Sequence, residues 1–106
     1  MKETGQTRVL GRGDERAAAG LLLDAIDERR VVAIVYDDGK GERTTREIEP
    51  LGLLRLGPWT VPAWCRLRDD ARVFRLDRIR AVRLTDERFA PRPGVDLEAL
   101  ARRGGR

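Results

Sequence analysis

The pattern of apolar and polar positions changes its period after residue 30. Before that point Ala18, Leu22, Ala25 and Ile26 recur at helical spacing, which predicts one amphipathic helix of about four turns. Asp14 is the expected N-cap of this helix. Beyond residue 30 the apolar positions come in short runs separated by Gly, Pro and Asp, as is typical of strands joined by turns.

The second part of the chain predicts five or six strands. They cover Val31–Tyr36, Glu42–Glu49, Leu51–Leu56, Trp59–Leu67, Arg72–Leu76 and Arg80–Thr85. Asp37–Gly41 is expected as a hairpin loop, in which glycine supplies the positive φ that such loops need. Asp77–Ile79 is short enough for a tight turn or a single helical turn. A short terminal helix is expected over Val95–Arg103.

The strand at Trp59–Leu67 has the most regular alternation in the chain. Alternation with a period of two places one set of side chains in the core and the other toward solvent. The expected inward set is Trp59, Val61, Ala63, Cys65 and Leu67. The expected outward set is Thr60, Pro62, Trp64 and Arg66.

One helix followed by closely spaced strands predicts a mainly β fold, a small and strongly bent antiparallel barrel. Its 106 residues favour one domain. We expect a flexible arm at 1–13, the barrel domain at 14–90, and a C-terminal tail at 91–106 that includes the short helix.

The composition excludes much chemistry. The chain has no histidine, so it offers no imidazole base, and its one cysteine, Cys65, cannot build a thiolate zinc site. We therefore expect no enzyme, no cofactor and no metal. The N-terminus has no hydrophobic signal core and no apolar run approaches the ~20 residues that span a bilayer, so we expect a cytoplasmic protein without membrane contact.

The net charge of +4 is unevenly distributed. Residues 1–54 carry a charge of −2, residues 55–92 a charge of +5, and residues 93–106 a charge of +1. A concentrated basic stripe is expected of a phosphate-binding surface, and the alternative is a solvated face of an arginine-rich protein.

Several segments occur in the order and at the spacing of a known family. The segments are Ala25-Ile26, Tyr36, Arg46 with Pro50-Leu51, Trp59-Thr60-Val61 with Ala63 and Cys65, and Arg72 with Phe74-Arg75 and Arg78-Ile79. Between Leu21 and about Phe89 the chain thereby resembles the WYL domain of bacterial transcriptional regulators. The name-giving Trp-Tyr-Leu reads Trp-Thr-Val here, so Thr60 removes an aromatic ring that Trp64 could partly replace.

The resemblance implies an Sm-like five-stranded antiparallel barrel with one N-terminal helix. It also implies a module that senses a ligand, reported for some members as nucleic acid, and passes the signal to a partner domain. Such domains usually follow a DNA-binding helix-turn-helix, for which an arm of about 13 residues is too short. We expect either a stand-alone WYL protein or a fragment of a longer regulator.

Arg46 is the first candidate binding residue. It shares strand parity with Ile48, so we expect it to project toward the apolar side of its strand. A buried arginine needs an anionic partner. That partner is either an internal carboxylate, for which Asp77 and Glu49 are candidates, or the phosphate of a ligand.

A second set of candidates is expected on an outer face. Arg66, Arg68 and Arg75 share it if the last long strands pair, and Thr60 and Trp64 add a stacking plane. The full set of expected ligand-binding residues is Arg46, Thr60, Trp64, Arg66, Arg68, Arg72, Arg75 and Arg78. Cations beside a stacking plane hold single-stranded nucleic acid, and the alternative is a solvated face with Asp69 and Asp70 as counterions.

These observations favour a ligand-sensing regulatory module of bacterial transcription. Its expected ligand is single-stranded nucleic acid or a nucleotide, and its expected partner is a DNA-binding regulator domain or chain. The alternative is a protein–protein interaction module that forms a dimer or a ring through its strand edges and binds no nucleic acid.

Overall fold

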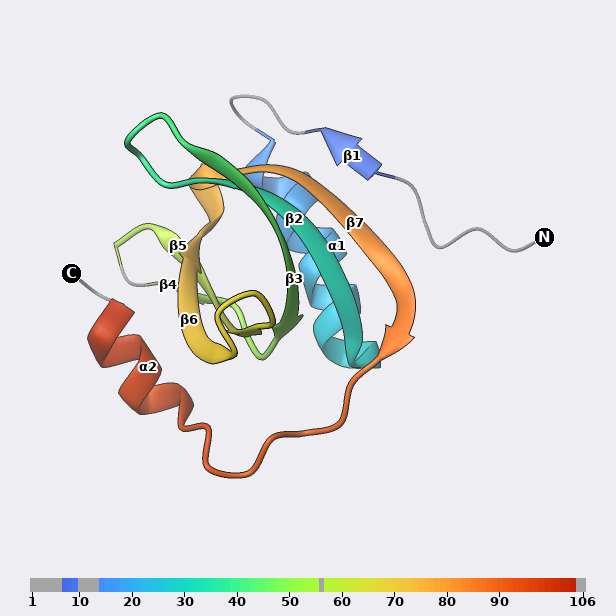
Figure 1. Cartoon of the computed structure of the whole chain (residues 1–106), viewed down its shortest axis with the longest axis vertical. Helices are drawn as coiled ribbons and strands as arrows, with labels where there is room; N and C mark the ends of the chain where they lie inside the picture. The colour runs from blue at the N-terminus through green and yellow to red at the C-terminus, as the bar shows by residue number, and fades with distance from the viewer. Residues whose placement is uncertain (1–6, 10–13, 56, 105–106) are drawn as a thin grey trace.

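The protein folds into a curved antiparallel sheet, with one helix before its five longer strands and one after them (Figure 1). A computed structural model describes residues 7–9, 14–55 and 57–104. The elements in order are β1 (Thr7–Val9), α1 (Glu15–Glu28), β2 (Arg30–Asp37), β3 (Arg43–Pro50), β4 (Leu54–Arg55), β5 (Trp59–Cys65), β6 (Asp70–Arg75), the 3₁₀ helix η1 (Leu76–Arg78), β7 (Ile79–Arg88) and α2 (Leu97–Gly104).

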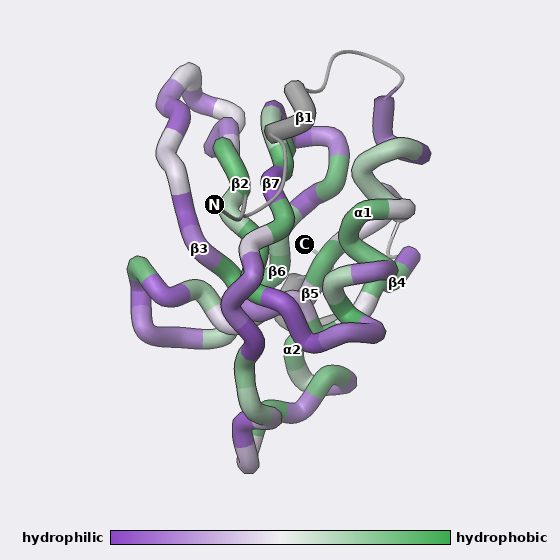
Figure 2. Tube along the Cα trace, turned by 90° about the vertical axis from the view of Figure 1, so that its right-hand side faces the viewer, coloured by the Kyte–Doolittle hydropathy of each residue, from purple (hydrophilic) through white to green (hydrophobic). Residues whose placement is uncertain are grey.

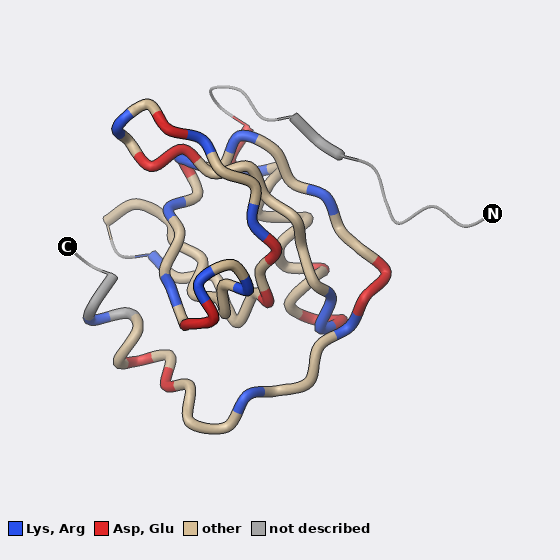
Figure 3. The backbone as a smooth tube through the Cα atoms, in the orientation of Figure 1, with Lys and Arg blue, Asp and Glu red and all other residues tan. Residues whose placement is uncertain are grey.

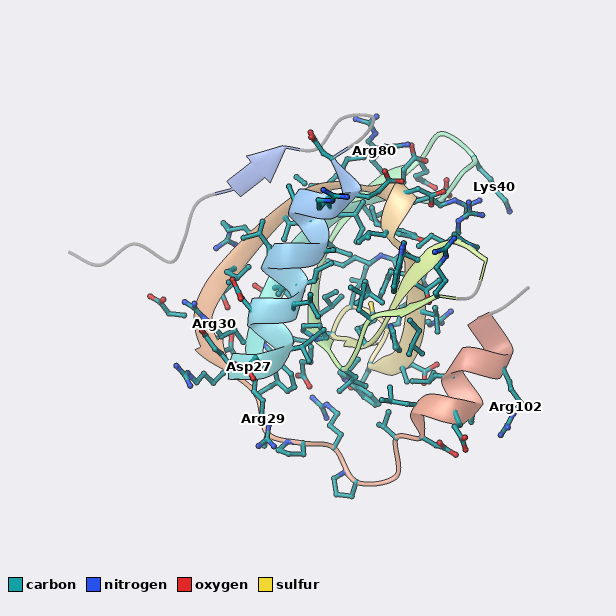
Figure 4. The ribbon with its side chains drawn as sticks, turned by 180° about the vertical axis from the view of Figure 1, so that it is seen from behind. Asp27, Arg29, Arg30, Lys40, Arg80 and Arg102 are labelled. Atoms are coloured by element: carbon teal, nitrogen blue, oxygen red, sulfur yellow. The ribbon has the colours of Figure 1, made fainter. Side chains whose placement is uncertain are left out.

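The helix α1 and the first hairpin follow the predicted boundaries closely. Asp14 occupies the N-cap position without a side-chain cap bond, and the Ala18 N–H donates to its carbonyl at 3.1 Å. The β2–β3 hairpin turns through Gly39 and Gly41, which both have positive φ, as expected for this loop. Figure 4 shows Lys40 at the tip of this hairpin. The predicted turn at Asp77–Ile79 is the single helical turn η1.

The strands are ordered β1-β7-β2-β3-β5-β4, and β6 pairs with the other edge of β5. Every pair of strands among the described residues is antiparallel, so a mainly β antiparallel fold with an N-terminal helix is confirmed. The described chain has seven strands rather than five, because the short β1 and β4 pair at the margins of the five longer strands. The sheet is open between β6 and β7 within the described pairings, so closure into a barrel is not confirmed.

The core lies on the concave face of the sheet. Leu22 of α1 packs there with Ile34, Ile48, Val61 and Val82, which are all at most 1% exposed. Apolar segments accordingly gather along β2, β5, β7 and α1 (Figure 2). Burial of each such side chain contributes about 1.5–3 kcal/mol, so this cluster is the main stabilising feature of the fold.

Both faces of β5 are covered, which changes part of the predicted alternation. Val61, Ala63 and Cys65 are buried as expected, but Thr60 and Pro62 are buried as well. Pro62 is buried because α2 packs over β5 and β6 and places Leu97 near Gly52 and Pro62. Outward positions on this strand therefore face protein rather than water.

Two expected core residues lie at the surface instead. Trp59 is 43% exposed because the pairing of β6 with β5 ends at Thr60, and Trp59 lies beyond it. Leu67 is 59% exposed because β5 ends at Cys65 and Leu67 lies in the following turn. Trp59 and Leu67 were predicted to be buried because the in-and-out alternation was continued past the part of β5 that pairs with β6.

The ends of the chain also take part in the described structure. Of the expected arm at 1–13, residues 7–9 pair with β7 as β1, and the remainder lies outside the described residues. The expected tail contains α2, whose Leu100 is 3% exposed and thus packed against the domain. Within the described chain, no helix has the length and apolar character needed to cross a bilayer.

Candidate ligand-binding site

Arg46 lies on the concave face of β3. Its Cα pairs with that of Ile34, and Ile48 follows two residues later on the same face. Both neighbours are fully buried, while Arg46 itself is half-buried. The structure therefore places Arg46 on the apolar side of its strand, at the margin of the core, as its parity with Ile48 predicts.

The described contacts of the Arg46 guanidinium are all with neutral groups. Its Nε donates to Thr44 Oγ1 at 3.0 Å, and its Nη1 lies 3.8 Å from Cys65 Sγ. The guanidinium carbon is 5.8 Å from the centroid of the Phe74 ring, a cation–π distance. Phe74 in turn meets Tyr36 edge to face at 5.0 Å. These contacts orient the cation without neutralising it.

The internal carboxylates considered as partners of Arg46 are bound elsewhere. Asp77 pairs with Arg75 at 2.7 Å, and this hydrogen bond lowers the pKa of Asp77. Glu49 lies on the opposite face of β3 and pairs with Arg66 and Arg92. Among the residues that the structure describes, no carboxylate forms an ion pair with Arg46. A half-buried cation without a counterion favours an anion from outside.

Arg72 adds a second cation to the concave side. It pairs with Ala63 of β5, and Phe74 lies two residues further along β6 on the same face. Its one described ion pair, with Asp70 at 3.8 Å, joins two side chains that are each about half exposed. Exposed pairs of this kind are worth little, so Arg72 remains available to a ligand.

Arg78 packs against the hairpin loop, and none of the ion pairs between described residues includes it. A Cβ built on Gly39 would lie 3.0 Å from the Arg78 guanidinium carbon. Asp37, beside this loop, accepts from the Gly39 N–H at 2.9 Å and from Arg80 at 3.4 Å. The bond from Gly39 is the main reason that the pKa of Asp37 is lowered. Acidic and basic residues alternate around this hairpin (Figure 3).

The structure does not bring Arg66, Arg68 and Arg75 together. Arg66 follows the end of β5 beside the turn, whereas Arg75 pairs with Thr60 at the opposite end of the β5–β6 hairpin. Arg68 is exposed in the turn itself. Arg75 is bound to Asp77 through two hydrogen bonds, which raise its pKa. The three cations were expected together because the sequence does not show where the strand ends.

Thr60 and Trp64 do not form the expected stacking plane either. Thr60 is 1% exposed, and its hydroxyl donates to the Leu54 carbonyl at 3.1 Å. Trp64 is covered by the guanidinium of Arg92, 4.3 Å from its ring centroid. Thr60 is therefore structural, and the Trp64 ring already carries a cation.

Arg92 and Glu49 form a contact that sequence reasoning missed. Arg92 donates to both Glu49 oxygens, at 2.8 and 3.0 Å, and Arg66 donates to Oε2 at 3.0 Å. Burial raises the pKa of Glu49, but the hydrogen bonds from the two arginines outweigh it and leave the pKa lowered. The partners are 43 residues apart in the chain, and no local pattern signals such a pair.

Comparison with known proteins agrees with the resemblance to the WYL domain that the sequence motifs indicate. The model of the WYL domain family matches residues 17–84. The chain belongs to the WYL family. This WYL chain is 30% identical over 88 residues to the uncharacterized HTH-type transcriptional regulator YobV of Bacillus subtilis, covering 82% of the chain and 28% of the relative. Protein PafB of Mycobacterium tuberculosis is 42% identical over 72 residues, which cover 66% of the chain and 21% of PafB.

A solved structure shows the same fold. The proteasome accessory factor B/C (PafBC) of Arthrobacter aurescens superposes with a TM-score of 0.72 at 25% identity, over 88% of this chain and 15% of that one. The WYL chain thus spans less than a third of the length of these relatives.

Proposed function

We propose that this WYL chain is the ligand-sensing module of a bacterial transcription regulator, and that it binds a phosphate-bearing ligand on the concave face of its sheet. The ligand class is single-stranded nucleic acid or a nucleotide. The module is not an enzyme, and it works with a DNA-binding domain or chain in the cytoplasm. Support for the regulatory role comes from the Bacillus relative, which is named an HTH-type transcriptional regulator.

The observation that carries the proposal is the unneutralised guanidinium of Arg46. It is half-buried, held by Thr44 and Phe74, and has no ion pair with a described carboxylate. A guanidinium fixed in this way binds phosphate oxygens through charge-assisted hydrogen bonds. Arg72 supplies a second cation on the same face. The half-buried Tyr36 ring, which meets the buried Phe74 edge to face, is the aromatic group there that a base can reach.

The architecture that we propose for this module is an Sm-like small barrel. Its support is the order β7-β2-β3-β5 with β6 on the far edge of β5, and the η1 turn, which leads from β6 back to β7. In such an arrangement the two outer strands face one another across the concave site.

Fluorescence anisotropy of a labelled single-stranded oligonucleotide of about ten nucleotides tests the proposed function. Two phosphate contacts, at Arg46 and Arg72, predict that affinity falls about sevenfold between 50 and 200 mM salt, given a slope of ~0.7 per contact on single strands. Arg46→Gln should weaken binding at least about tenfold, the value of one charge-assisted hydrogen bond. An affinity that is independent of salt, or unchanged by Arg46→Gln, would contradict the proposal.

Arg43→Gln is the matched control for this experiment. Arg43 lies on the same strand but on the opposite face, is 61% exposed, and has its one described ion pair with Asp37 at 3.8 Å. The substitution removes the same charge. Binding should therefore change by less than about twofold, because long-range attraction alone is screened by salt.

Trp59 favours the second candidate function, an interaction module. This residue is 43% exposed beside a cavity of about 280 Å³ that Arg55, Pro58 and Leu76 help to line. Exposed tryptophan is enriched at the centres of protein interfaces. Light scattering at two protein concentrations tests self-association, which a constant mass of 12.0 kDa would exclude.

A further inference from the structure

The segment from Phe89 to Asp96, here called the strap, connects β7 to α2 and passes the ends of β3 and β5. At its start the Phe89 N–H donates to the Arg29 carbonyl at 2.9 Å. At its end α2 is anchored by Leu100, which is 3% exposed. The strap runs along the open side of the domain (Figure 1), and Arg102 of α2 projects away from the sheet (Figure 4).

One side chain holds the middle of the strap. Pro91 and Pro93 flank Arg92 and carry no N–H group, so this part of the strap cannot join the sheet through a regular backbone ladder. Arg92 instead forks onto both oxygens of Glu49 and covers the ring of Trp64. Glu49 is 1% exposed although it points to the outer face, because the strap covers it.

The strap is not packed tightly onto the sheet. A cavity of about 460 Å³ lies beneath it, lined by Trp64, Arg66 and Arg88 together with Phe89 and other strap residues. Arg66 donates to Glu49 Oε2 at 3.0 Å from outside the strap, so Glu49 keeps a cationic partner when Arg92 departs. These features allow the strap to lift without leaving Glu49 unpaired.

The strap contact and the candidate ligand site share one strand pair. Ile48 pairs with Cys65 and Glu49 with Trp64 where β3 meets β5. On the concave face Arg46 lies against Cys65, and on the outer face Glu49 and Trp64 hold Arg92. A shift of Arg46 toward a ligand therefore acts on the same two strands that hold the strap.

We propose that Arg92 is a latch: its bridge to Glu49 and Trp64 holds the strap and α2 closed, and ligand binding at Arg46 changes the strength of that hold. The second half of the proposal rests on the proposed function. Two sites that bias one mobile element are coupled reciprocally, so loosening the latch must also change the affinity for the ligand.

Hydrogen exchange of the full chain tests the latch without any ligand. In Arg92→Gln, amides of residues 97–104 should exchange at least about fivefold faster, while those of β2 keep their rates. Arg88→Gln is the control, since Arg88 lines the same cavity, is exposed, and has no ion pair within the described residues. Unchanged exchange in Arg92→Gln, or an equal increase in α2 and β2, would overturn the latch.

Oligonucleotide affinity tests the coupling. The two variants lose the same charge, so a difference between them in Kd reports the latch and not the charge. We expect a difference of at least about threefold. In the unmodified protein, the oligonucleotide should alter the hydrogen exchange of α2. Equal Kd values would overturn the coupling. If the unmodified protein does not bind the oligonucleotide, the proposed function and the coupling both fail, and the exchange experiment still decides the latch.

Discussion

Arg46 and Glu49 occupy opposite faces of β3, and among the described residues only Glu49 has oppositely charged partners. Glu49 receives three hydrogen bonds from Arg66 and Arg92, whereas Arg46 rests on Phe74 and a threonine hydroxyl. The strand thus separates a satisfied charge cluster on its outer face from an unsatisfied cation on its concave face. The proposals above give the first the role of holding the strap and the second that of binding the ligand.

The isolated charge of Arg46 should cost stability. Replacement by methionine keeps the length of the side chain, preserves contact with Phe74 and removes the uncompensated charge. Arg46→Met is therefore expected to raise the free energy of unfolding by about 0.5–2 kcal/mol while abolishing oligonucleotide binding. Urea denaturation measures the first effect, and a loss of stability would show that Arg46 serves the fold.

Thr60 should behave as a structural residue, although it stands at the family's name-giving motif. Thr60→Val removes the hydroxyl that donates to the Leu54 carbonyl and keeps the shape of the side chain. We expect a loss of about 1 kcal/mol in the free energy of unfolding, the value of one net hydrogen bond. Oligonucleotide affinity should stay unchanged. If the folded variant bound the oligonucleotide more weakly, Thr60 would be part of the ligand site.

Acid should destabilise the protein through Glu49. Its pKa in the folded state lies below the ordinary value, so its contribution to stability is complete above the ordinary carboxyl range and is lost as pH falls through the lowered pKa. Urea denaturation at neutral pH and at about pH 3 should show this loss, more weakly in Glu49→Gln. That variant should also cost about 1.5–3 kcal/mol at neutral pH. Equal acid sensitivity in both proteins would refute the assignment to Glu49.

The β2–β3 hairpin offers a matched pair of glycines for testing the position of Arg78. Both Gly39 and Gly41 have positive φ, but only a Cβ at Gly39 would meet the Arg78 guanidinium, at 3.0 Å. Each substitution by alanine should cost about 1 kcal/mol in backbone strain. Gly39→Ala should cost more than Gly41→Ala in thermal denaturation, and equal losses would mean that Arg78 does not pack there.

The sequence predicts local structure well where one face of a helix or strand is exposed to solvent and the other is buried. The helix before residue 29, the β2–β3 hairpin and the concave position of Arg46 all follow from periodicity, because each has a buried face and an exposed one. On β5 the same method fails for Thr60, since α2 and β4 cover the side that should face water.

The charge pattern predicts a basic region but not its pairing. The excess of arginine in residues 55–92 is real, yet Arg66, Arg75 and Arg92 have carboxylate partners in the fold. Those partners lie from two to 43 residues away, and the more distant ones are brought near only by strand pairing and by the strap. Net charge therefore overstates the surface that is open to phosphate. Within this segment the candidate is Arg72, whose ion pair with Asp70 is long and exposed, and it joins Arg46 of β3 on the concave face.

The most direct measurement of the central claim is the Nε–H resonance of Arg46 in ¹⁵N-labelled protein titrated with the single-stranded oligonucleotide. Arg46 Nε donates to Thr44 in the free protein, so its resonance reports any new partner of this guanidinium. The account predicts a saturable shift of the Arg46 signal, with the Arg43 signal unchanged. Saturable binding that leaves the Arg46 signal in place would contradict it.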